Sequence, residues 1–111
     1  MNTMEYLSGK LKDQIQRLKS DKNGALECVS EFSVKAIKEQ IKRMRKSLRM
    51  RQSDLAQISG LKQPAISRLE NESNHSVTLS TLQTVANSMG CVVIVDIKPL
   101  SEVLSDIEKK P

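Results

Sequence analysis

Apolar residues recur at helical spacing along most of the chain. The first stripe predicts an amphipathic helix that ends at Asn23-Gly24, because Asn and Gly tolerate the left-handed backbone that closes helices. It consists of Met4, Leu7, Leu11, Ile15 and Leu18. A short second helix is expected over residues 25–32, and Ser33 is the expected N-cap of a long helix that follows.

The middle of the chain predicts four helices in succession. They are expected at 34–48, 51–59, 63–71 and 79–89, with Thr78 as the cap of the last one. The residues expected to face inward are Val34, Ile37, Ile41, Met44, Leu48, Leu55, Ala56, Ile58, Ile66, Leu69, Leu79, Leu82, Val85, Ala86 and Met89.

The pattern changes after Gly90. Residues 91–98 are mostly β-branched and stop at Pro99, which predicts a strand. The chain offers no second convincing strand, so the simplest partner is the same segment of a second copy. The dimerisation residues would be Val92, Val93, Ile94 and Val95. In the tail, 99–111, apolar residues at helical spacing suggest a short helix that becomes ordered against a partner.

Composition favours a mainly α protein with an aliphatic core. The only aromatic residues are Tyr6 and Phe32. The chain has no apolar run long enough for a membrane span and no signal-peptide pattern at its start, so a cytoplasmic location is expected. Cys28, Cys91 and His75 are too scattered for a metal site, and no cofactor motif or catalytic constellation appears. We therefore expect no enzymatic activity.

The net charge of +5 is unevenly distributed. Residues 1–33 are neutral and residues 91–111 sum to −1, whereas residues 34–90 carry ten Lys and Arg against four Asp and Glu. A basic middle between ends with almost no net charge indicates a polyanion-binding module. Most of the cations lie on the long helix or just past it, where they either contact phosphate or form an ordinary solvated face: Lys35, Lys38, Lys42, Arg43, Arg45, Lys46, Arg49 and, just past the helix, Arg51.

The segment from Arg51 to Asn71 carries the most specific pattern. Two short helices joined by a tight turn need a small residue early in the first helix, a glycine at the turn and an aliphatic residue in the second. Ala56, Gly60 and Ile66 meet these needs. Such a turn projects the second helix outward, where it fits a DNA major groove about 12 Å wide.

Residues 34–90 resemble the Xre/Cro-type helix-turn-helix family. The resemblance rests on Gln52-Ser-Asp-Leu-Ala56, Gly60-Leu61, Gln63-Pro-Ala-Ile-Ser67-Arg-Leu-Glu70-Asn71 and Thr78-Leu-Ser-Thr-Leu82. It implies a lambda-repressor-like domain that binds double-stranded operator DNA. It also implies that Gln52 contacts a phosphate and braces Gln63 at the start of the recognition helix. The chain departs from the family at Lys62, where Ser or Thr usually caps the helix, and at Glu72, which replaces the usual glycine.

Each residue of the predicted recognition helix that can face the DNA major groove has an expected contact. Gln63 can bond adenine through its amide, and Pro64 and Ala65 can contact a thymine methyl. Ser67 and Arg68 point to bases or phosphates, although Arg68 could instead pair with Glu70 or Glu72. His75 is expected to be an ordinary solvated loop residue. The complete set of expected DNA-binding residues is Arg51, Gln52, Lys62, Gln63, Pro64, Ala65, Ser67, Arg68, Asn71, Ser73 and Asn74.

The arrangement around the helix-turn-helix also resembles HigA- and HipB-type antitoxins. Its parts are an N-terminal helical extension (1–33), the DNA-binding domain (34–90), a dimerisation strand (91–98) and a C-terminal tail (99–111). The resemblance implies a homodimer that neutralises a small basic toxin from the same operon and represses that operon. The stripe of Met4, Leu7, Leu11, Ile15 and Leu18 could hold the toxin, or pack on the core or the dimer mate. A stand-alone regulator of phage or restriction-modification type is the alternative.

Overall fold

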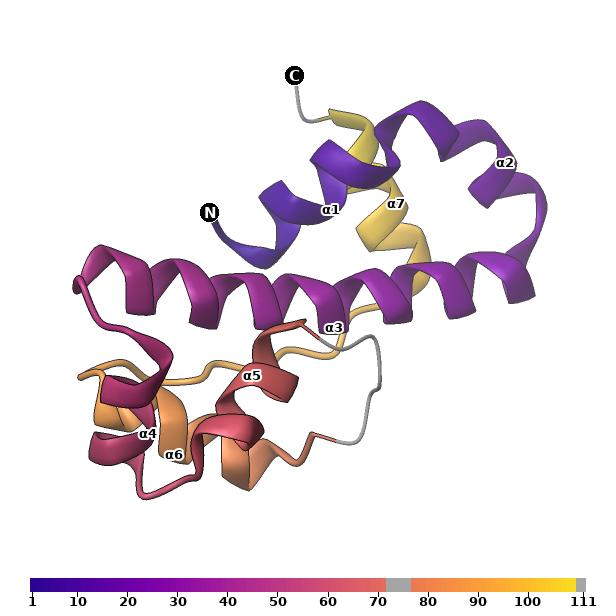
Figure 1. Ribbon diagram of the computed structural model, residues 1–111. Coiled ribbons are helices and arrows are strands. Elements are labelled where there is room, and N and C mark those ends of the chain that lie inside the picture. The colour runs from indigo at the N-terminus through magenta and orange to yellow at the C-terminus, as the bar shows by residue number, and fades with distance from the viewer. Residues whose placement is uncertain (72–76, 110–111) are drawn as a thin grey trace. The chain divides into compact units, whose positions relative to one another are not determined.

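A computed structural model describes residues 1–71 and 77–109, and it divides into two compact units (Figure 1). Unit 1 comprises residues 1–37 and 96–111, and unit 2 comprises residues 38–95. The helices are α1 (Thr3–Leu11), α2 (Ile15–Ser20), α3 (Lys22–Ser47), α4 (Gln52–Ser59), α5 (Gln63–Asn71), α6 (Leu79–Ser88) and α7 (Leu100–Lys109), and a 3₁₀ turn, η1 (Lys12–Gln14), follows α1. Helix α3 contributes its first part to unit 1 and its last part to unit 2.

Unit 1 has a core built from both ends of the chain. Helix α1 begins with a capping box, in which the Asn2 side chain accepts the Glu5 backbone N–H at 2.8 Å. The apolar faces of α1, α2, α3 and α7 meet in one cluster of buried residues: Leu7, Leu11, Leu18, Ala25, Val29, Leu104 and Ile107. An ion pair between Lys19 and Glu108 links α2 to α7 at the surface. The expected helix in the tail is therefore present, and it packs within the same chain.

The N-terminal stripe lies inside this core. Leu7, Leu11 and Leu18 are buried, and Met4 and Ile15 pack against them. Of the three roles left open for the stripe, the structure favours packing on the chain's own core. These five side chains do not form a free face for a toxin in the folded unit.

Two predicted helix boundaries near residue 30 are wrong. Asn23-Gly24 does not end a helix but lies in the first turn of α3, and Ser33 lies within α3 instead of capping a new helix. The physical reason is Asp21, whose side chain accepts the Gly24 backbone N–H at 3.1 Å and so starts the helix early. The first turn of a helix tolerates Asn and Gly, and no break separates 25–32 from 34–47.

Unit 2 has a second aliphatic core made by the end of α3 with α4, α5 and α6. Its buried apolar members are Ile41, Leu55, Ala56, Ile66, Leu69, Leu82, Val85 and Ala86. Thr78 caps α6 as predicted, since its hydroxyl accepts the Thr81 backbone N–H at 3.1 Å. Gly90, with φ of 76°, closes the same helix in the left-handed conformation.

Some residues expected inside unit 2 are exposed. Met44, Leu48, Ile58 and Leu79 have exposed fractions between 39% and 51%. The inward face of α4 contains Leu55 and Ala56, and Ile58 lies outside that face. Near its end α3 turns the polar residues Lys38 and Arg45 inward together with Ile41, so Met44 and Leu48 face outward.

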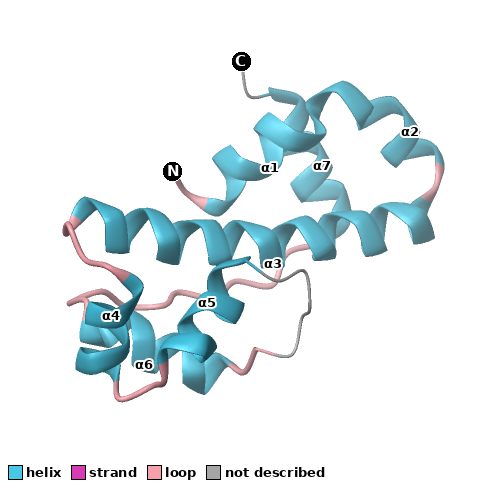
Figure 2. Ribbon diagram, in the orientation of Figure 1, coloured by secondary structure: helices cyan, strands magenta, loops and turns pink. Residues whose placement is uncertain are grey.

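The predicted strand over 91–98 is not formed in the isolated chain. Figure 2 shows loop from Gly90 to Pro99 and no strand in the described residues. In the described part of the chain no backbone hydrogen bond joins residues 92–98 to another segment. A strand needs a neighbouring strand, and this chain supplies none. Val92, Ile94, Val95 and Ile97 are consequently 59–99% exposed.

Candidate nucleic-acid interface

Helices α4 and α5 form the predicted helix-turn-helix within unit 2. Gly60 joins them in the left-handed conformation, with φ of 78°, and its backbone N–H bonds the Ala56 carbonyl at 3.0 Å. Glycine adopts this geometry without the steric cost that a side chain adds. Ala56 is buried on α4, and Ile66 is fully buried on α5. The three residues singled out by spacing thus have the expected places.

Helix α5 has one buried face and one outward face. Ile66, Leu69 and Glu70 are buried. The positions between them point away from the core, and the outward residues are Gln63, Pro64, Ser67, Arg68 and Asn71. Of these, Ser67 is partly covered and the other four are exposed, while Ala65 is partly buried beside them. An exposed and largely polar face of this kind can present hydrogen-bonding side chains to base edges in a major groove.

Glu70 is the buried anchor of this helix. Its carboxylate receives two bonds from the Arg45 guanidinium, Nε to Oε2 at 2.6 Å and Nη2 to Oε1 at 2.8 Å. The exposed fractions of the two side chains are only 9% for Arg45 and 0% for Glu70. The Gln52 amide donates a further bond to Oε1 at 3.2 Å. These bonds fix α5 to α3 and to the start of α4.

The same guanidinium also holds the loop between α3 and α4. Arg45 Nη1 donates to the Met50 carbonyl at 2.8 Å. Arg49, the residue before Met50, has φ of 59°. The Arg49 backbone N–H donates to the Lys46 carbonyl, and the Met50 backbone N–H donates to the Arg45 carbonyl. This is the hydrogen-bond pattern of a Schellman cap with arginine in the position that usually holds glycine. Arg45 therefore organises the loop and the recognition helix together.

Electrostatics keep the buried pair ionised. Burial alone would raise the pKa of Glu70, but the hydrogen bonds from Arg45 and Gln52 and the charges of Arg45 and Lys42 outweigh it, and the pKa lies below its usual value. The hydrogen bond to Glu70 raises the pKa of Arg45. The network thus stays charged at neutral pH.

Sequence reasoning missed this network. It treated Arg45 as a surface cation and Glu70 as a possible partner of Arg68, but Glu70 pairs with Arg45. A signal was present: Glu70 follows Ile66 by four positions and Leu69 by one, which places it on the inward face of the predicted helix. A carboxylate buried there needs a cationic partner.

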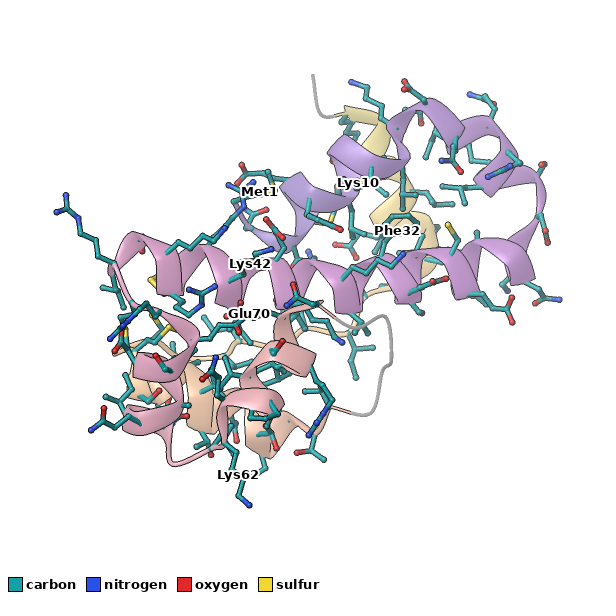
Figure 3. The ribbon with its side chains drawn as sticks, in the orientation of Figure 1. Met1, Lys10, Phe32, Lys42, Lys62 and Glu70 are labelled. Carbon is teal, nitrogen blue, oxygen red and sulfur yellow. The ribbon has the colours of Figure 1, made fainter. Side chains whose placement is uncertain are left out.

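Three of the expected DNA-binding residues differ in their surroundings. Lys62 is exposed and projects away from the helices of unit 2, whereas Glu70 lies between α5 and α3 (Figure 3). Arg51 is exposed but paired with Asp54. Gln52 is partly buried and its side chain bonds Glu70; no bond to Gln63 is found within the described residues. The implied bracing of Gln63 by Gln52 is thus replaced by bracing of Glu70. Ser73, Asn74 and His75, with Glu72, lie outside the described residues.

The net charge is divided between the two units much as it is divided along the sequence. Unit 2 contains nine Lys and Arg and four Asp and Glu, whereas unit 1 contains nine of each. The entire net charge of +5 therefore belongs to the unit that carries the helix-turn-helix. In unit 2 the exposed Arg43 of α3 is paired with Glu39, so part of this charge is an ordinary solvated face.

A family model described as a helix-turn-helix domain matches residues 26–98, which is more than half of the chain. The chain belongs to this helix-turn-helix family. Comparisons with curated proteins and with solved structures gave no significant match. Membership in the helix-turn-helix family indicates sequence-specific DNA binding in transcription regulation. No described helix is long and apolar enough to cross a membrane.

Within residues 1–71 and 77–109, no group of three or more His, Cys, Asp or Glu is arranged to hold a metal ion. Cys28 and Cys91 are both free and partly buried.

Proposed function

We propose that the chain is an operator-binding repressor that reads DNA through the outward face of α5. The observation that supports this most directly is the exposed polar face of α5, held from behind by the buried Arg45–Glu70–Gln52 network. A recognition helix must be held rigidly, because misplacement by an ångström breaks a bidentate base contact. Gln63 is the proposed base reader, and Lys62 and Asn71 are proposed phosphate contacts.

The proposed repressor acts as a homodimer paired through residues 91–98. Residues 92–98 form no backbone hydrogen bond to another described segment and include exposed β-branched side chains, which suits strand addition by a second copy. Other large apolar residues of unit 2, among them Met44, Leu48 and Ile58, are also exposed and favour a further covering surface. Two recognition helices would then enter major grooves about 34 Å apart on a palindromic site.

Within this proposal, the chain is an antitoxin whose unit 1 receives a small basic toxin encoded in the same operon. Two points support it: the resemblance to HigA- and HipB-type antitoxins, and the presence of a separate helical unit with no net charge, built from both ends of the chain. A unit with no net charge gains nothing from DNA phosphates and is free for a protein partner. No catalytic role is assigned to the chain. The alternative is a stand-alone regulator whose unit 1 serves the dimer.

DNA reading is tested with Gln63→Ala, against the chain's own promoter fragment and a random-sequence duplex. The promoter complex should weaken by about 1–3 kcal/mol, and the random duplex should be bound as before. Gln83→Ala is the matched control, since Gln83 is an exposed glutamine of α6 in the same unit. Equal losses on both duplexes would remove Gln63 from base reading.

Dimer pairing is tested with Ile94→Pro, because proline removes a backbone donor and cannot sit in a central paired strand. Sedimentation should show a monomer, and a variant that stays dimeric would exclude the segment as the dimer seam. Ile97→Thr is a useful companion: Ile97 is 99% exposed, so this substitution disturbs no core packing and keeps the backbone donor.

The antitoxin role is tested by expressing the tagged chain with the neighbouring reading frame of its operon. Under the proposal a small protein co-purifies, is toxic when expressed alone and is silenced by this chain. A harmless neighbour that does not co-purify would favour the stand-alone regulator.

A further inference from the structure

The N-terminus of α4 carries an ion pair that the DNA-binding proposal does not use. The Arg51 backbone N–H donates to Asp54 Oδ2 at 2.7 Å. The Arg51 guanidinium adds two bonds to the same carboxylate, Nε to Oδ2 and Nη2 to Oδ1, both at 3.3 Å. The exposed fractions are 83% for the Arg51 side chain and 38% for that of Asp54. The pair therefore faces solvent beside the turn that begins the helix-turn-helix.

Arg51 shares its pairing with Arg43, which bonds Glu39, and differs in this respect from three other exposed cations of unit 2. Within the described residues, Lys46, Lys62 and Arg68 are exposed and take part in no ion pair. Among the described exposed cations, the Arg51 guanidinium reaches both oxygens of its carboxylate, whereas the Arg43 bond to Glu39 reaches one. The hydrogen bonds from the guanidinium and from the Arg51 backbone lower the pKa of Asp54, so this carboxylate is charged at neutral pH.

At this helix end, the groups that could bind a DNA phosphate are already bonded to the Asp54 carboxylate. Helix N-termini and arginine side chains both attract phosphate. Here Asp54 takes the Arg51 backbone N–H and one edge of the guanidinium, and its own charge repels a second anion. The Arg51–Asp54 pair carries no net charge, so it releases few counterions when it meets the duplex.

We propose that Asp54 masks Arg51 and thereby lowers the sequence-independent affinity of unit 2 for DNA. This inference rests on the proposed DNA-binding function. Because the contact involves phosphate, the mask acts on every sequence alike and leaves discrimination between sequences to α5. It limits non-specific binding to the genome, where random sites vastly outnumber operators.

The test is Asp54→Asn in the full chain, because asparagine keeps an oxygen that can accept the Arg51 backbone N–H. Binding is measured on a random-sequence duplex and on the promoter fragment over a range of salt concentrations. Affinity for both should rise about two- to five-fold, the size expected when one exposed ion pair is removed. The slope of log affinity against log salt should steepen by up to about one.

Arg51→Ala in each background isolates the mask. In the wild type it should change the salt slope little, and in Asp54→Asn it should flatten the slope by about one. Glu31→Gln is the matched control, because it also removes one acid from an exposed helical ion pair, with Lys35, but in unit 1. This control should leave DNA affinity within the error of the wild type.

Three results would overturn the mask. They are a loss of affinity in Asp54→Asn, an equal slope change for Arg51→Ala in both backgrounds, or an equal gain from Glu31→Gln. The first would make Asp54 a residue that positions Arg51. If the wild-type chain binds neither duplex at low salt, the DNA-binding proposal itself fails, and that result is distinct from the other three.

Discussion

The buried Arg45–Glu70 pair makes the sharpest prediction about stability. Glu70→Gln keeps the size and shape of the side chain but leaves the Arg45 guanidinium without its counterion. Both side chains are almost completely buried, with exposed fractions of 9% for Arg45 and 0% for Glu70. Removing one partner of such a pair typically costs 3–5 kcal/mol, and the glutamine oxygen can still accept one of the two bonds. We therefore expect a loss of about 3 kcal/mol.

That loss is a large share of the 5–15 kcal/mol that stabilises a typical domain. Urea unfolding followed by circular dichroism measures it, and hydrogen exchange shows whether the α5 amides lose protection first. Glu39→Gln is the matched control, because Glu39 pairs with Arg43 at 3.2 Å on the exposed surface of α3. The control should lose less than about 1 kcal/mol.

Replacing both residues of the pair separates the cost of an unpaired buried charge from the cost of changing these two side chains. Arg45→Met combined with Glu70→Leu should be less destabilising than Glu70→Gln alone, because no charge is left uncompensated in the core. If Glu70→Gln costs no more than Glu39→Gln, the pair does not hold α5 in place, and the reasoning on the recognition helix is refuted.

The remaining predictions concern pH and two backbone positions. The lowered pKa of Glu70 means that its stabilisation is complete above the unfolded value of about 4.3 and is lost as the pH falls from there through the folded pKa. Acid titration of stability should show this loss in the wild type and a smaller one in Glu70→Gln. Gly60→Ala should cost about 1–2 kcal/mol in urea unfolding, because φ is 78° at Gly60, and an unchanged midpoint would contradict this. Arg49→Gly should instead increase the free energy of unfolding by up to about 1 kcal/mol, because φ is 59° at Arg49, and the melting temperature should rise accordingly.

The helix-turn-helix could be predicted because its determinants are local. Each determinant is a single residue type at a fixed position: a glycine at the turn (Gly60), a small residue in the first helix (Ala56) and a helix cap (Thr78). The structure accordingly has α4, α5 and α6 within a residue or so of the predicted ranges.

The long helix α3 could not be delimited from the same signals. Asn23-Gly24 and Ser33 both suggested boundaries, but turn-forming residues are also tolerated in a first helical turn or inside a helix that packing holds. The Asp21 cap and the buried Ala25 and Val29 decided the outcome, and burial in a core formed with α1, α2 and α7 is a long-range fact.

The buried charges were hidden for a related reason. Hydropathy places arginine and glutamate outside, so Arg45 was counted with the solvated cations of α3. Its burial depends on Glu70, which is 25 residues away in the sequence. The stripe at the end of α3 therefore shifts to Ile41 and Arg45 and leaves Met44 exposed.

The most direct test of the central claim, that α5 reads a specific DNA sequence, is selection of bound duplexes from a random pool by the wild-type chain. The account predicts enrichment of one palindromic sequence whose half-sites are about one helical turn apart. It also predicts that Gln63→Ala relaxes the preference at one base pair of each half-site. Retention of DNA without enrichment of any sequence, or an unchanged preference in Gln63→Ala, would contradict it.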